Sequence, residues 1–152
     1  MLCVTSGFSF NRTCINFQNL DSESEASQVY WDWLLRYVKL SRANAALHNV
    51  YQKDAKAVFF DLNDDGIDEI LGTHFSSAKN TNGEWLLYVL QKDKNGKYKE
   101  ITGEPVYFDA IHPVCIMAKK TGEYHNIQVF NELSDKSIIF VFHPEKGLYF
   151  KK

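Results

Sequence analysis

The feature that most constrains this chain is the alternation of apolar and polar residues that begins at Ala57 and continues almost to its end. A period of two is the pattern of a β-strand with alternating buried and exposed side chains. Turn-forming pairs such as Asn95-Gly96 separate the alternating runs at regular spacing. The pattern predicts antiparallel strands near residues 57–60, 67–75, 84–92, 97–101, 112–118, 124–131, 137–142 and 147–151.

One of these strands is apolar on both of its faces. Its sequence is Trp-Leu-Leu-Tyr-Val-Leu, residues 85–90. Such continuous apolar runs are typical of strands that are covered on both sides. A helix can cover only one side, so a second layer of sheet, the N-terminal arm or a partner chain must cover the other.

The residues before the strands predict an amphipathic helix. Ser22 and Glu25 fit a capping box, in which each side chain satisfies a free amide of the first turn. Apolar residues then recur at helical spacing from Ala26 to Val38. We expect helix through about residue 40, and residues 41–51 also favour helix after a break near residue 41.

Composition excludes several classes of partner. The net charge of −2 leaves no basic field to attract nucleic acid, so we expect no nucleic-acid partner. No stretch approaches the roughly 18 consecutive apolar residues of a transmembrane helix, so we expect no membrane span. The 22 aromatic residues, 11 Phe, 8 Tyr and 3 Trp, suit strand-rich structure and protein interfaces.

The sharpest chemical signal is an acidic loop, Asp-Leu-Asn-Asp-Asp-Gly-Ile-Asp-Glu, at residues 61–69. Its carboxylates repel one another in a tight turn unless a cation compensates them or they extend into water. Oxygen donors at alternate positions suit Ca²⁺, and Gly66 permits the sharp turn. The predicted ligands are the side chains of Asp61, Asn63, Asp65 and Glu69 and the backbone carbonyl of Ile67.

This loop is not an EF-hand, because Gly72 occupies the position of the closing glutamate. It resembles the calcium loop of FG-GAP and VCBS-type repeats, which joins two strands, although Asp64 replaces the Gly frequent at the fourth position. The loop occurs once, which excludes a propeller. The resemblance, extended by a second hairpin at residues 83–99, implies a small exported bacterial protein of unassigned activity.

These patterns together predict an α+β fold. An N-terminal arm, residues 1–20, with at most one short strand, precedes a single α+β domain over residues 21–152. In that domain an N-terminal amphipathic helix packs on an antiparallel β meander that contains one calcium-binding strand-loop-strand.

The cysteines bear on the compartment. Cys3 and Cys14 are close in sequence and are interpreted as a bridge, whereas Cys115 lies in an apolar run and is interpreted as a buried thiol. We expect a periplasmic or secreted protein. The first residues lack the pattern of a secretory signal, so an exported form would have lost its signal from this chain.

No nucleophile elbow, phosphate-binding glycine loop or dinucleotide motif is present, so an enzyme is the minority hypothesis. The leading expectation is a non-catalytic, calcium-stabilised protein-binding module, such as an inhibitor or immunity protein that acts on a secreted or envelope-acting toxin. The alternative is a small hydrolase or ligand-binding protein. Its pocket would lie between helix and sheet and be lined by residues such as Tyr88, Tyr107 and His112.

Overall fold

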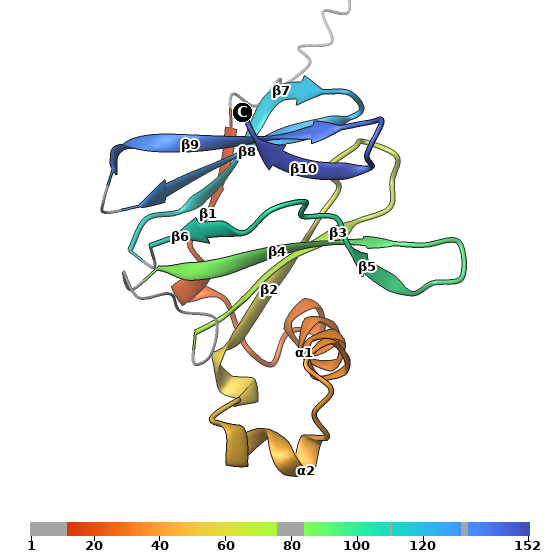
Figure 1. The fold of residues 1–152 in the computed structure, drawn as a ribbon, viewed down its shortest axis with the longest axis vertical. Helices are drawn as coiled ribbons and strands as arrows, with labels where there is room; N and C mark the ends of the chain where they lie inside the picture. Colours follow the sequence, from red (N-terminus) through yellow and green to blue (C-terminus); the bar gives the residue numbers. More distant parts are fainter. Residues whose placement is uncertain (1–11, 76–83, 110, 132–133) are drawn as a thin grey trace, which may run out of the picture.

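The structure, a computed structural model, describes residues 12–75, 84–109, 111–131 and 134–152. Two antiparallel sheets form most of it (Figure 1). Sheet A has the order β1 (Arg12–Ile15), β7 (Val114–Thr121), β8 (Tyr124–Asn131), β9 (Ser134–His143) and β10 (Leu148–Lys151). Sheet B has the order β2 (Ala55–Phe60), β3 (Glu69–His74), β4 (Trp85–Lys92) and β5 (Tyr98–Glu100), with β6 (Val106–Phe108) also paired to β4. The two α-helices are α1 (Glu25–Tyr37) and α2 (Arg42–Ala45).

Sheet B is the middle layer, with sheet A on one face and α1 on the other (Figure 1). The core between the sheets includes Leu71, Leu87 and Val89 of sheet B and Ile116 and Val129 of sheet A. The core under α1 contains other residues of the same strands, such as Ile70 and Leu90. Side chains therefore alternate along β3 and β4 between two separate cores, as the pleat of a strand requires.

The predicted α+β fold, an N-terminal helix packed on a single meander, is wrong. The structure is mostly antiparallel sheet, and its first helix begins only at Glu25, after strand β1. The physical reason is the apolar character of both faces of sheet B, because a 13-residue helix covers one face only. A second sheet covers the other, and residues 12–15 of the predicted arm are one of its strands.

The helix also begins later than predicted. Its N-cap is Ser24, whose hydroxyl accepts a hydrogen bond from the amide of Ser27 at 3.2 Å. Ser22 lies in the preceding turn. A hydrogen bond from the amide of Ser24 to the backbone carbonyl of Asp21, at 3.2 Å, closes this turn. Ser27 also accepts the amide of Ala57 at 3.0 Å, which fixes the first turn of α1 to β2.

The observed strands correspond in position to the eight predicted ranges, with two additions: β1, for which the predicted arm left room as a short strand, and β6. The sequence analysis missed β6, which has only three residues and pairs with β4 opposite Trp85, Leu86 and Leu87. Neither α1 nor α2 has the length and apolar character needed to cross a membrane, and no other described helix has them.

The predicted pairing of the cysteines is wrong. Cys14 forms a disulfide with Cys115, which faces it across the β1–β7 pair at a Cα–Cα distance of 4.0 Å. Cys3 lies outside the described residues. Local spacing misled the prediction because β1 pairs with a strand that is far away in the sequence.

We predict that this disulfide contributes strongly to stability. It joins residues 101 positions apart, and closing so long a loop is worth about 4–5 kcal/mol in the chain-entropy model. The paired change of Cys14 and Cys115 to Ala should lower the free energy of unfolding in urea by about 2–5 kcal/mol. Cys3→Ala is the matched control and should leave it unchanged. Alkylation of both Cys14 and Cys115 in protein purified without reductant would contradict the pairing.

A buried histidine of β3 contacts both α1 and the segment that leads into β2. His74 is 0% exposed, lies against the ring of Trp31 at 5.9 Å, and donates a hydrogen bond from Nε2 to the carbonyl of Tyr51 at 2.9 Å. Burial lowers the pKa of His74 below its usual 6.5, although the Tyr51 carbonyl and the charge of Asp54 act in the opposite direction. The folded protein therefore holds this imidazole neutral at pH values where the unfolded chain binds a proton.

We predict an acid-sensitive contribution from His74. Its depressed pKa gives stability that is present above the unfolded value, about 6.5, and is lost as the pH falls toward the folded value. His74→Gln keeps an N–H donor for Tyr51 but cannot titrate. Urea unfolding at a series of pH values should therefore show a smaller loss of stability on acidification in the variant. Parallel curves for the two proteins would rule out this role.

Candidate metal centre

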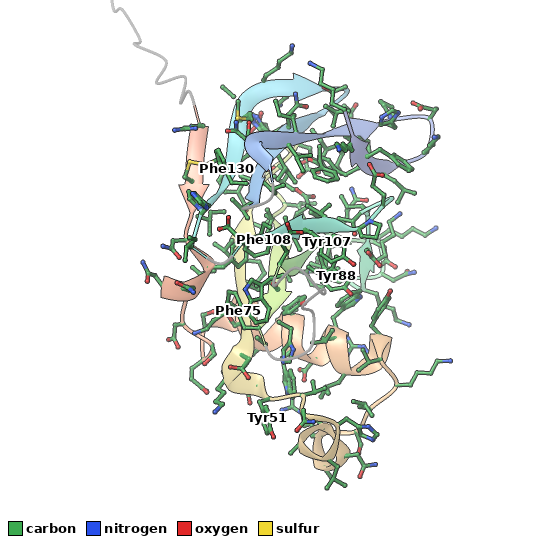
Figure 2. All side chains as sticks on the ribbon, turned by 60° about the vertical axis from the view of Figure 1, so that its left-hand side comes forward. Tyr51, Phe75, Tyr88, Tyr107, Phe108 and Phe130 are labelled. Atoms are coloured by element: carbon green, nitrogen blue, oxygen red, sulfur yellow. A yellow bond between two sulfur atoms is a disulfide. The ribbon has the colours of Figure 1, made fainter. Side chains whose placement is uncertain are left out.

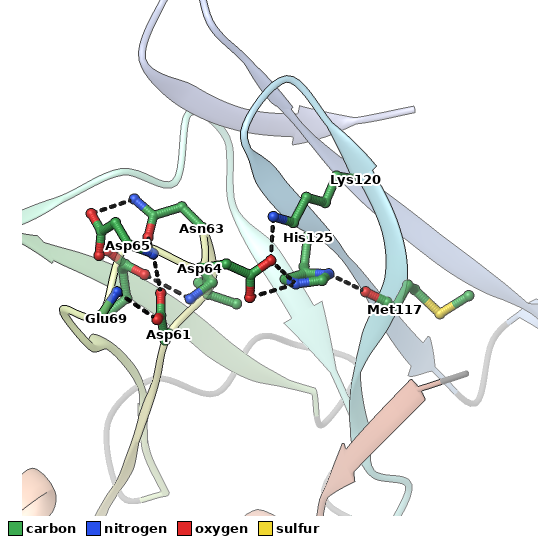
Figure 3. Close-up of polar contacts among 10 residues, drawn as sticks. Asp61, Asn63, Asp64, Asp65, Glu69, Met117, Lys120 and His125 are labelled. Carbon is green, nitrogen blue, oxygen red and sulfur yellow. Dashed lines mark hydrogen bonds and ion pairs between the residues drawn. The ribbon is translucent and has the colours of Figure 1, made fainter. Parts of the chain in front are cut away.

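The acidic loop connects β2 to β3 at the edge where sheet B faces sheet A (Figure 3). Asp61 directly follows Phe60, the last residue of β2, and Glu69 is the first residue of β3. Phe60 and Glu69 are register partners, so the two ends of the loop are held side by side. The strands thus bring together candidate ligands that are eight positions apart in the sequence.

The backbone amides of the loop orient Asp61. Its two carboxylate oxygens accept the N–H of Asp65 at 3.1 Å and the N–H of Gly66 at 2.8 Å. Gly66 has φ +83°, a conformation that is strained for other residues and that turns its amide back toward the loop. Asp61 therefore sits at the centre of the turn, as the first ligand of a calcium loop must.

Asn63 and Asp65 face each other across the same turn. The Asn63 amide nitrogen donates to one Asp65 carboxylate oxygen at 2.9 Å, and its carbonyl oxygen accepts the Asp65 N–H at 3.3 Å. The other Asp65 oxygen accepts the N–H of Ile67 at 2.8 Å. Asp61, Asn63, Asp65 and Glu69 lie together on one side of the loop (Figure 3).

Glu69 closes the group from the buried side. It is 1% exposed, and its carboxylate accepts the backbone N–H of Leu62 at 2.8 Å. Burial raises the pKa of Glu69 to about 7, and the charges of Asp65 and Asp61 act in the same direction against the Leu62 hydrogen bond. Among the described residues, no ion pair involves Asp61, Asp65 or Glu69. Their mutual repulsion is therefore not compensated by a basic side chain of this part of the molecule.

Asp64 has a different role from its neighbours. Its carboxylate points away from the group and forms ion pairs with Lys120 of β7 and with His125 of β8, the latter at 3.2 Å (Figure 3). Hydrogen bonds from Lys120 and His125 lower the pKa of Asp64. Its φ of +59° explains why glycine is frequent here in the loops that this one resembles. Asp64 thus ties the loop to sheet A.

The donor chemistry of the loop fits Ca²⁺. The predicted ligands supply oxygen donors, and an oxygen that accepts one hydrogen bond keeps a second lone pair for a cation. The described residues do not, however, gather three or more His, Cys, Asp or Glu side chains closely enough to hold a metal. The carboxylates instead accept hydrogen bonds from loop amides, so a bound ion would need small movements of the side chains.

Of the residues of the predicted enzyme pocket, Tyr88 and Tyr107 lie near each other on the paired strands β4 and β6, whereas His112 contacts Asp109 and Phe130 instead. Tyr88 lines a small cavity near the end of α1. Tyr107 and His112 line neither this cavity nor the larger groove beside the acidic loop, which is described next. His112 forms an ion pair through Nδ1 with the buried Asp109 at 2.7 Å. Cys115 is oxidised in the disulfide, so it cannot be the thiol of a Cys-His pair with His112.

A large open groove borders the loop on the helix side of sheet B. Its volume is about 1040 Å³, and four segments line it: one face of α1, Phe59 of β2, loop residues 66–68, and the β4–β5 hairpin. Glu25, Asp32 and the basic Arg36 lie on the helix, and basic Lys92 and Lys97 lie on the hairpin. The sequence analysis missed this groove and the link from Asp64 to sheet A, because both join residues that are distant in the sequence.

Comparison with known proteins found no matching protein family, no matching curated protein and no matching solved structure. The similarity of residues 61–71 to FG-GAP and VCBS-type loops therefore rests on the loop sequence alone.

Proposed function

We propose that this protein is a calcium-stabilised, non-catalytic module that binds another protein through the groove beside its acidic loop. One observation carries the proposal: Ile67 belongs to both features. Its carbonyl is a candidate calcium ligand, and its side chain, 55% exposed, lines the groove. An ion that fixes the loop therefore also fixes one wall of the groove.

The loop supports the calcium part of the proposal through its unbalanced charge. Asp61, Asp65 and the buried Glu69 lie on one side of the loop, and no ion pair of the described residues involves any of the three. A bound Ca²⁺ would supply the missing positive charge and cross-link the two ends of the loop. The backbone amides of the loop orient the ligands: that of Leu62 binds the carboxylate of Glu69, and those of Asp65 and Gly66 bind the carboxylate of Asp61.

The groove supports the protein-binding part. Apolar Val29, Phe59 and Tyr98 lie between a helix wall that carries both charges and a basic hairpin wall. This combination of apolar centre and polar rim is typical of protein interfaces. The occupant that suits it is a segment of a partner protein with an apolar side chain for the centre. Acidic residues on that segment would face Lys92 and Lys97.

The cross-strand disulfide supports an exported, bacterial-type location, periplasmic or secreted, because disulfides persist in oxidising compartments. Within that setting, the specific form that we propose is an inhibitor or immunity protein that covers a site on a secreted or envelope-acting toxin.

The Asp109–His112 pair favours a second candidate, a small hydrolase. A buried carboxylate that orients a half-exposed imidazole has the geometry of a general base with its positioning group. The imidazole would take a proton from a water molecule that attacks the ester or amide carbonyl, and would return that proton to the leaving alcohol or amine. His112→Ala would then abolish turnover of a screened ester or amide substrate without unfolding the protein.

We predict that calcium raises the melting temperature. The carboxylate of Asp61 should be needed for this rise, and the carboxylate of Asp64 should not. For a Kd near about 0.1 mM and about 2 mM Ca²⁺, mass action gives roughly 1.8 kcal/mol, or about 5 °C. Asp61→Asn should remove most of the shift, because it weakens a central ligand. Asp64→Asn is the matched control in the same loop, and it should keep the shift because its carboxylate contacts Lys120 and His125 instead.

Melting curves of the three proteins with calcium and with chelator decide the point. Equal curves for the unmodified protein in both conditions, with no calcium by elemental analysis, would reject the site. Equal loss of the shift in both variants would show a general charge effect in place of ligation.

We predict that substitutions in the groove weaken partner binding. The partner would first be captured from the envelope fraction of the native host, and its affinity measured with purified components. Ile67→Ala and Lys97→Ala should each cost more than about 1 kcal/mol, about fivefold in Kd, if they contact the partner. Leu47→Ala is the control, since Leu47 is 80% exposed but does not line the groove. A panel in which only Leu47→Ala weakens binding would move the interface elsewhere.

A further inference from the structure

A second, smaller cavity lies at the C-terminal end of α1. Its volume is about 230 Å³, and it opens to solvent between the last turn of the helix, the middle of β4 and the segment after β5. Tyr37 and Tyr88 supply aromatic surface, and Glu100 and Glu104 supply carboxylates. No residue of the acidic loop lines it.

The aromatic part of the cavity is held in place by ring contacts. The rings of Tyr37 and Tyr88 meet nearly edge to face at 5.7 Å. Trp33 lies behind both, at 4.8 Å from Tyr37 and 5.3 Å from Tyr88. Tyr88 projects from β4 toward the helix side of sheet B (Figure 2). These contacts hold the two aromatic rings that line the cavity in a fixed arrangement.

The charged part of the cavity has one sign. Its lining contains Glu100 and Glu104 and no Lys, Arg or His. The Thr102 hydroxyl donates to Glu100, and the backbone N–H of Lys151 donates to Glu104. No ion pair of the described chain involves either carboxylate. The cavity therefore attracts positive charge and repels anions.

Two tyrosines on this side of sheet B have raised pKa values, mainly because they are buried. Burial raises the pKa of Tyr88, and Tyr37 and Glu100 raise it further. Behind Tyr88 lies Tyr30, whose pKa is also raised by burial, Tyr88 and Glu100. The Tyr30 hydroxyl is fully buried and has no hydrogen-bond partner among the described residues.

We propose that this cavity binds an alkylammonium group, the positively charged head of a small amine or of a lysine side chain. Aromatic faces attract such a group through its charge while contacting its carbon atoms, and the carboxylates neutralise it. The cavity admits one head group. A bare divalent metal ion is disfavoured because aromatic rings replace the oxygen donors that such an ion needs.

The test is titration of the isotope-labelled full chain, followed by the amide shifts in NMR spectra. Choline, n-butylammonium and N-acetyl-lysine methylamide are the probes, and the neutral tert-butyl analogue of choline controls for shape. Cation-dependent shifts should cluster at Tyr37, Tyr88 and residues 100–105. Tyr37→Ala and Glu100→Gln should each weaken binding about threefold to tenfold.

Two substitutions elsewhere provide matched controls. Tyr51→Ala removes another partly exposed tyrosine, and Glu145→Gln removes another exposed carboxylate, and both should leave binding unchanged. Tighter binding of the lysine derivative than of the free amines identifies a protein side chain as the source, and the reverse identifies a small amine. Equal binding of the neutral analogue, shifts outside the cavity, or unchanged affinity in Glu100→Gln would overturn the proposal. The titration is done in chelator without a protein partner, so it does not depend on the function proposed above.

Discussion

The architecture depends on the need of sheet B to bury both of its faces. Ile70 and Leu90 point toward the helix, while Leu71 and Val89, their neighbours in sequence, point toward sheet A, and all four are 0% exposed. Each face removed from water contributes roughly 25 cal/mol for every square ångström of apolar area. Neither covering layer alone can supply both contributions. The fold therefore needs both covering layers, the helix on one face of sheet B and sheet A on the other.

The acidic loop is connected to this core by a short series of backbone contacts. The amide of Leu62 donates to Glu69, while its carbonyl accepts the amide of His125 at 2.7 Å. The carbonyl of His125 in turn accepts the hydroxyl of Tyr149 at 2.7 Å. Leu62 and Tyr149 are both 0% exposed. A change in the charge of the loop thus acts on residues that hold the two sheets together, and not on a surface turn alone.

Sequence reasoning succeeded where the determining contacts are local. Strand positions follow from alternation, which is a pattern of neighbouring residues. The calcium site, inferred from a spacing confined to nine residues, stays a prediction. Sequence reasoning failed where contacts between segments far apart in the sequence decide the structure. Cys14 was matched with its sequence neighbour because nothing near it indicates β7 as its partner strand. The capping-box pattern predicts Ser22 as the cap because it considers only two nearby side chains. The observed cap is Ser24, which bonds the amide of Ser27, and Ser27 is fixed by its contact with β2.

The place of β1 in sheet A has a consequence for the order in which the molecule assembles during synthesis. The helix and sheet B come from a contiguous middle segment, residues 25–108, and can pair soon after they leave the ribosome. β1 emerges first but pairs with β7, which is made about a hundred residues later. Until then the sheet A face of sheet B is uncovered and the thiol of Cys14 has no partner strand. The nascent chain therefore passes through a stage with an exposed apolar face and a free cysteine, and the long separation of β1 from β7 in the sequence makes their pairing a late step of folding.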